Sequence, residues 1–131
     1  MIEIVKEICD LARNRDVSFA TLKKYNGNHI INGHQVIFEV YDDRLILSVR
    51  DTSNTNMLQI GYYTSGTYNT CIYIRSGSSP DNDWCGFIFD NYQFTKILLM
   101  VLIVLTKHKT ITAKNIFNLF KRHQPEIFTT A

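Results

Sequence analysis

The stretch Lys96–Thr106, KILLMVLIVLT, decides the fold of this chain. Its residues 97–105 are all apolar, so a helix built from them has no side that is suited to water. Such a helix is normally central in a domain, with other elements packed around it. A membrane span needs about 20 apolar residues, so this shorter run predicts a buried helix of a globular domain.

The residues on either side of this run set the ends of the helix. Asp90, followed three residues later by Gln93, fits a capping box at a helix start. Lys107–Lys109 includes two lysines, which complement the negative end of the helix dipole. The sequence therefore predicts a helix over about 91–107.

Two further helices are expected, one near each end of the chain. Apolar residues recur at helical spacing over 2–13, with charged residues between them. Near the other end, Thr110 or Thr112 is placed to cap a helix over about 113–123, and Pro125 stops it. Both helices carry apolar side chains that need a core to pack against.

The segment between these helices has the pattern of antiparallel strands. Apolar and polar residues alternate over 36–41 and 45–50, and the acidic pair Asp42-Asp43 joins the two runs, which predicts a hairpin. Polar loops then separate three more strands, expected at 57–63, 68–75 and 84–89.

Residues 17–34 fit two different interpretations. Ser18 is placed to cap a short helix that runs to Tyr25 and is closed by Asn26-Gly27. The same residues also fit an edge strand, with Asn26-Gly27 as a hairpin turn. The sequence alone leaves both open.

Together these elements predict a single α+β domain over residues 1–131, built in two layers. The N-terminal helix is followed by an antiparallel meander of four to five strands. The central hydrophobic helix and the C-terminal helix then pack on one face of the sheet. A chain of 131 residues, 45% hydrophobic and 20% charged, is typical of a globular domain with a sizeable core.

Motifs for enzymatic, metal and cofactor chemistry are missing from the sequence. No Cys-x-x-Cys or His-x-x-x-His spacing occurs, and neither a Walker A sequence nor a Gly-x-Ser-x-Gly elbow is present. The run Asp81–Gly86 begins like a calcium loop, but Tyr92 stands where the final glutamate is needed. We therefore predict no catalytic residue, no metal site and no cofactor. A small enzyme that uses Cys85 with a histidine as its base is the third-ranked interpretation.

Cysteine use and the N-terminal charges indicate a reducing compartment. Three cysteines, Cys9, Cys71 and Cys85, do not fit a disulfide scaffold. Charged residues from Glu3 to Asp10 do not fit a signal peptide, so a cytoplasmic protein is expected. Many isoleucines and asparagines with only two prolines suggest an A/T-rich coding genome. This composition fits a phage or viral accessory protein that acts in the cytoplasm or nucleus of its host cell.

The net charge of +2 is unevenly distributed along the chain. Residues 1–90 carry 8 Lys and Arg against 11 Asp and Glu, whereas residues 91–131 carry 6 against one. Such a basic segment is suited to a polyanion. Nucleic-acid binding through this C-terminal region is therefore the alternative function.

Two surfaces are candidates for binding a protein partner. Strand alternation sets tyrosines and arginines on the sheet face opposite the core, and these residue types give large contact areas at low entropy cost: Tyr41, Arg50, Tyr63, Tyr73 and Arg75. The second surface is the C-terminal helix, with apolar and basic residues suited to a partner or a dimer contact: Phe117, Phe120, Lys121 and Arg122. The sequence thus predicts a small non-enzymatic protein–protein interaction module, expected to form a homodimer.

Overall fold

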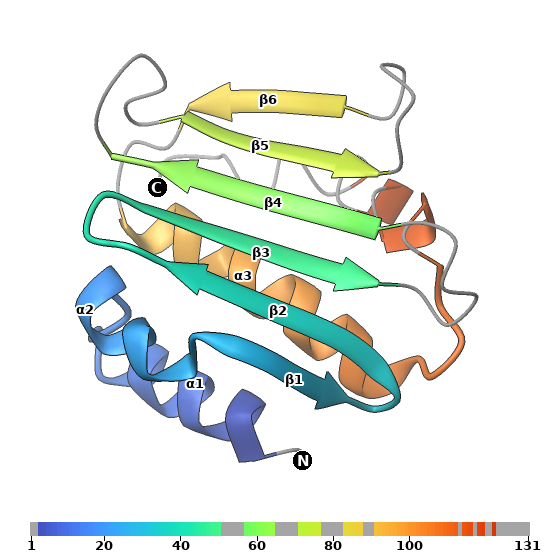
Figure 1. Cartoon of the computed structure of the whole chain (residues 1–131), viewed down its shortest axis with the longest axis horizontal. Helices are drawn as coiled ribbons and strands as arrows, with labels where there is room; N and C mark the ends of the chain where they lie inside the picture. The colour runs from blue at the N-terminus through green and yellow to red at the C-terminus, as the bar shows by residue number, and fades with distance from the viewer. Residues whose placement is uncertain are drawn as a thin grey trace.

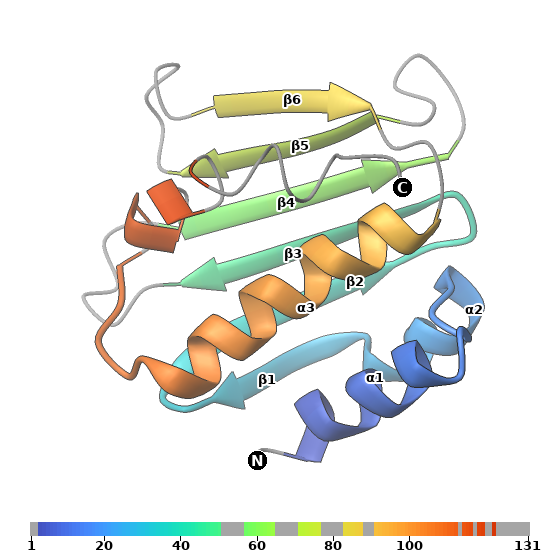
Figure 2. The same ribbon diagram turned by 180° about the vertical axis from the view of Figure 1, so that it is seen from behind.

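A computed structural model describes residues 3–50, 57–64, 71–76, 83–87, 91–112, 114–116, 118–119 and 122. Its sheet forms one layer, and the helices lie together behind it: α1 (Glu3–Arg13), α2 (Phe19–Leu22) and α3 (Asn91–Lys107) (Figure 1). Seen from behind, α3 crosses the sheet diagonally and α1 lies beside it (Figure 2). The predicted two-layer α+β fold is confirmed, and the bounds of α3 agree with the predicted 91–107.

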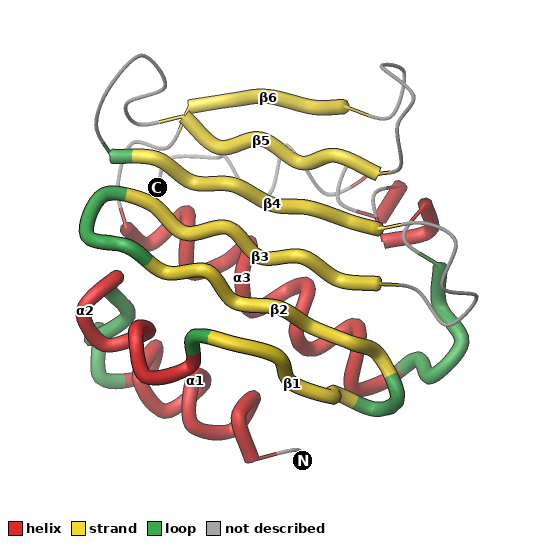
Figure 3. The backbone as a smooth tube through the Cα atoms, in the orientation of Figure 1, coloured by secondary structure: helices red, strands yellow, loops and turns green. Residues whose placement is uncertain are grey.

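The sheet is a meander in which every strand pairs antiparallel with the next one along the chain (Figure 3). Its strands, in both spatial and chain order, are β1 (Gly27–Ile31), β2 (His34–Val40), β3 (Arg44–Arg50), β4 (Met57–Tyr63), β5 (Cys71–Ser76) and β6 (Asp83–Phe87). The described sheet therefore has six strands, against an expectation of four to five. The additional strand is β1, which lies in the segment that the sequence left open.

Residues 17–34 combine the two interpretations. Ser18 caps α2 through a reciprocal box: the Thr21 N–H donates to the Ser18 hydroxyl (3.1 Å), and the Ser18 N–H donates to the Thr21 hydroxyl (2.9 Å). A single 3-10 turn, η1 (Lys23–Tyr25), follows, and the chain then enters β1 at Gly27, whose φ is +116°. Asn26-Gly27 therefore closes the helical segment and is not the hairpin turn.

The hairpin turn between β1 and β2 is Asn32-Gly33, which the sequence analysis did not identify. Both residues have positive φ, +52° and +86°. This combination defines a type I′ turn, whose twist matches that of the two strands, and Asn-Gly is its favoured sequence.

The core lies between the sheet and α3. The α3 side chains that face the sheet are almost completely buried: Phe94, Ile97, Leu98, Val101, Leu102 and Leu105. On its other sides α3 has half-buried apolar side chains: Leu99, Met100, Ile103 and Val104. The expectation that this helix is central is met, although its outer side is less covered than the inner one. None of the described helices is long and apolar enough to cross a membrane.

The β1–β2 turn also holds the C-terminal end of α3. The side-chain amide of Asn32 donates to the carbonyl oxygens of Leu105 and Thr106, both at 3.1 Å. His34, which is 1% exposed, donates from Nε2 to the carbonyl oxygen of His108 (2.8 Å). The last carbonyls of a helix have no partner within the helix, so these side chains satisfy groups that would otherwise need water.

Residues beyond α3 begin the C-terminal helix as predicted. The Thr112 hydroxyl accepts a hydrogen bond from the Asn115 N–H (3.1 Å), which identifies Thr112 rather than Thr110 as the cap. Residues 114–116, 118–119 and 122 are helical, and Ile116 is 2% exposed in the core. Asp90, the predicted cap of α3, lies outside the described residues.

We predict that Asn32→Asp lowers the free energy of unfolding by about 1–3 kcal/mol, because it replaces a donor with an acceptor that faces two carbonyl oxygens. Urea denaturation measures the change. The matched control is Asn118→Asp at an exposed position of the C-terminal helix, which should change stability by less than about 0.5 kcal/mol. Equal effects of the two substitutions would contradict a specific role for Asn32.

Candidate functional site

The sheet face that points away from the helices is not covered by any described element (Figure 1). We call this surface the open face. Its described side chains come from alternate positions of β1–β4 and from Tyr41 at the end of β2: Asn28, Ile30, Gln35, Ile37, Glu39, Tyr41, Arg44, Ile46, Ser48, Arg50, Gln59, Gly61 and Tyr63.

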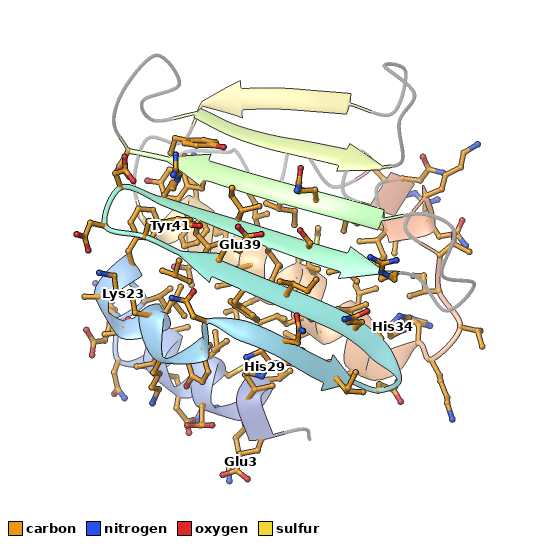
Figure 4. The ribbon with its side chains drawn as sticks, viewed as in Figure 1. Glu3, Lys23, His29, His34, Glu39 and Tyr41 are labelled. Atoms are coloured by element: carbon orange, nitrogen blue, oxygen red, sulfur yellow. The ribbon has the colours of Figure 1, made fainter. Side chains whose placement is uncertain are left out.

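Tyr41 and Arg44 form the most exposed aromatic cluster of the open face. The guanidinium carbon of Arg44 lies 4.6 Å from the centre of the Tyr41 ring, and the Tyr41 ring is 43% exposed. The Tyr41 hydroxyl is 3.5 Å from a carboxylate oxygen of Glu39, and Figure 4 shows the two residues close together. Strand register sets Tyr63 opposite Arg44. Two tyrosines, an arginine and an acid thus gather at this end of β3.

The middle of the open face combines two half-buried isoleucines, Ile37 and Ile46, with small or polar residues. Ser48 is only 4% exposed, because the side chains around it cover it. The Gln59 amide lies 3.5 Å from the Ser48 hydroxyl, and Gly61 stands opposite Ile46 on the next strand. A glycine inside a strand often marks a place where another molecule approaches the backbone closely.

The structure separates the predicted site residues into two groups. Tyr41 and Tyr63 lie at one end of the open face, whereas Arg50 lies at the other end of β3, about 20 Å away by the rise of a strand. Register sets Tyr73 opposite Gly61 and Arg75 opposite Gln59, on the same rows of the sheet. The side chains of these last two predicted residues lie outside the described part.

Arg44 belongs to this surface, although the sequence analysis did not select it. The predicted strand began at Leu45 and the predicted turn was Asp42-Asp43, so Arg44 was left outside both. The alternation that selected Arg50 continues backwards through Ser48 and Ile46 to Arg44, and this was the available signal. The Nε–H groups of Arg44 and Arg50 are both buried without a hydrogen-bond partner in the described region.

The second predicted surface can be described only at one position. Arg122 is helical and exposed, while Phe117, Phe120 and Lys121 lie outside the described residues. The prediction that these residues form a partner or dimer contact therefore stays a prediction.

The described histidines and cysteines lie apart and make structural contacts. His29 Nε2 is 2.6 Å from the carbonyl oxygen of Tyr25, and His34 bonds to the end of α3. Cys9 is half-buried on α1 against the core. Within the described ranges, no three His, Cys, Asp or Glu side chains are grouped as metal ligands would be. Cys85 occupies β6 opposite Tyr73, and its side chain is not among those described.

Comparison with models of known protein families, with curated proteins and with solved structures finds no match for this chain. The open face is therefore interpreted from its own geometry.

An ion pair lies beside the Tyr41 end of the open face, where Lys23 of η1 contacts Asp42 in the β2–β3 turn. The lysine ammonium lowers the pKa of the Asp42 carboxyl below its ordinary value. Because the pKa is lower in the folded state, the pair contributes stability above the ordinary pKa of aspartate. That contribution is lost as the pH falls through the lowered pKa.

We predict that Lys23→Ala raises the pKa of Asp42 towards its ordinary value, about 3.9. A pH titration of the Asp42 carboxyl carbon by NMR measures the change. Lys6→Ala, which removes an exposed lysine from α1, should leave this pKa unchanged. The ion pair would have no influence on Asp42 if both variants titrated as the unmodified chain does.

Proposed function

We propose that the protein is a non-enzymatic protein-binding module that contacts its partner with the open face. One observation carries this proposal: no described helix covers this face, and it presents Tyr41 beside an arginine at one end and Arg50 at the other. Tyrosine and arginine are the residue types enriched at the energetic centres of protein interfaces. Arg44 and Arg50 are half-buried, and a guanidinium forms strong hydrogen bonds with carboxylate or carbonyl groups of a partner.

The charge near the open face favours a protein partner over a nucleic acid. Glu39 is exposed among the arginines, and Asp42 and Asp43 are exposed in the adjoining turn. These acids would repel phosphates, whose attraction to cations supplies most of non-specific nucleic-acid affinity. A role as a phage or viral accessory protein in the host cytoplasm or nucleus belongs to this proposal and rests on composition and cysteine use.

Affinity capture with matched variants tests the proposal. The immobilised chain is exposed to lysate of its native cell, in parallel with Tyr41→Ala/Arg44→Ala and with Lys6→Ala/Arg13→Ala. The second pair removes the same number of exposed side chains, from α1 in the helical layer. We expect a protein that the unmodified chain and the α1 variant retain and the open-face variant loses.

The purified partner should then bind the open-face variant at least about tenfold more weakly, as calorimetry measures, because interface tyrosines and arginines often contribute more than 1 kcal/mol each. Equal retention by all three chains would place the contact elsewhere and contradict the proposal.

A second candidate function is nucleic-acid binding through the basic C-terminal region. Lysines and one arginine are exposed at the end of α3 and beyond it: Lys107, Lys109, Lys114 and Arg122. If these residues bind phosphates, Lys107→Ala/Lys109→Ala should weaken binding to labelled DNA and RNA and reduce its salt dependence. Fluorescence anisotropy at two salt concentrations measures both effects. Binding that is absent at low salt, or insensitive to salt, would reject this function.

A further inference from the structure

The strand β1 forms an exposed edge of the sheet. In the described part of the chain it pairs only with β2, on one side. Its sequence, GNHII, contains no charged residue and no proline, which are the usual devices that protect an edge from pairing. Ile30 is 67% exposed and, with Tyr41, is one of the two most exposed large hydrophobic side chains that the structure describes. Such an edge is a template for another strand.

Hydrogen bonds at the far end of β2 show which groups of β1 point outward. Both the N–H and the C=O of Val40 face the β1 side, because they bond to the side-chain amide of Asn26 (2.6 and 3.2 Å). In an antiparallel ladder this orientation recurs at every second residue. The β2 residues that bond to β1 are therefore His34, Val36 and Phe38, whose register partners are Ile31, His29 and Gly27.

The type I′ turn gives the same result independently. In a two-residue hairpin the residues that flank the turn, here Ile31 and His34, form a hydrogen-bonded pair. It follows that Asn28 and Ile30 direct their N–H and C=O groups away from β2, and both residues are exposed.

We propose that β1 pairs antiparallel with β1 of a second copy of this chain, about a two-fold axis that passes through His29. In this register Asn28 of each copy stands opposite Ile30 of the other. The outward N–H and C=O groups of both residues then find partners in both copies. A register centred on Asn28 or on Ile30 leaves some of these groups without a partner in the opposite β1.

The second copy fits this edge because β1 is complementary to itself. The bonding groups are placed symmetrically about His29, and β1 contains no Lys, Arg, Asp or Glu that would meet its own copy across the axis. On the open face the two Ile30 side chains become diagonal neighbours, within reach of each other. Each exposed isoleucine thus gains an apolar contact with the other, which a polar foreign segment would not supply.

This pairing also bears on the proposed function, although it does not depend on it. A two-fold axis between antiparallel strands of one sheet is perpendicular to that sheet. The open faces of the two copies therefore point in the same direction and form one continuous surface. A partner with two matching sites would bind this surface more tightly than either half alone.

Sedimentation equilibrium of the full chain tests the dimer without any partner. We expect a reversible dimer that Ile30→Lys weakens by about tenfold or more, because lysine at an edge opposes strand pairing. Ile30 is largely exposed, so this substitution should leave the circular dichroism spectrum and the thermal midpoint nearly unchanged. The matched control, Glu39→Lys, also introduces a lysine on the open face, but one strand further in, and should leave the dimer intact.

Cross-linking tests the register. Opposite residues of a hydrogen-bonded antiparallel pair have Cα atoms about 5.5 Å apart, which suits a disulfide. An oxidised mixture of Asn28→Cys and Ile30→Cys chains should therefore give mainly the mixed dimer. In the unmodified chain, amide exchange of Asn28 and Ile30 should slow as concentration rises, a measurement that needs no variant.

Four results would each overturn the proposal. In sedimentation, the first is a strict monomer at millimolar concentration, the second is a dimer that Ile30→Lys leaves unchanged, and the third is a dimer that Glu39→Lys dissociates instead. In amide exchange, the fourth is protection of the Asn28 and Ile30 amides only after lysate is added. The third would indicate that open faces meet each other, and the fourth that β1 pairs with a strand of a different protein. A dimer that behaves as expected, together with equal retention of every captured protein by the unmodified chain, the open-face variant and the α1 variant, would refute the proposed function alone.

Discussion

The burial of α3 against one face of the sheet is the contact on which the rest of this structure depends. The apolar positions of α3 match the apolar rows of β2, β3 and β4, and each fully buried aliphatic or aromatic side chain contributes about 1.5–3 kcal/mol before entropy is counted. The turn at Asn32 and the ring of His34 hold the end of this helix, so its position along the sheet is fixed as well as its face. The apolar contacts stabilise the packing of α3 on the sheet, and these hydrogen bonds fix the position of α3 along the sheet.

Placing the described helices on one side has a direct effect on the other side of the sheet. The open face must be compatible with water, and most of its alternating residues are polar or amphipathic, with Ile30, Ile37 and Ile46 as the apolar exceptions. On this face Tyr41 interacts with Arg44 and with Glu39, whereas the rings of His29 and His34 bond to backbone carbonyls on the other side of the sheet.

The sequence predicted those parts of the fold that follow from periodicity. The β2–β3 hairpin and the two layers followed from the spacing of apolar residues, and the bounds of α3 followed from the capping residue and lysines that flank its apolar run. The β1 strand was ambiguous because Asn26-Gly27 and Asn32-Gly33 are both turn signals, and only pairing with β2 distinguishes a helix stop from a hairpin turn. Arg44 was missed because strand ends are set by ladder bonds rather than by pattern. The role of Asn32 rests on a contact with residues 73 and 74 positions later, which no local signal encodes.

That long separation also governs how the chain acquires its structure as it is synthesised. The ribosome adds about 5–20 residues per second, so the β1–β2 turn waits roughly 4–15 seconds for the end of α3 to appear. During this interval the apolar side of β2 and β3 has already emerged and lacks its helical layer. A polypeptide that ended before α3 would contain all six strands but would lack the helix that covers the apolar face of the sheet. Until α3 is synthesised, the exposed apolar face makes the incomplete chain prone to aggregate, and chaperones protect surfaces of this kind.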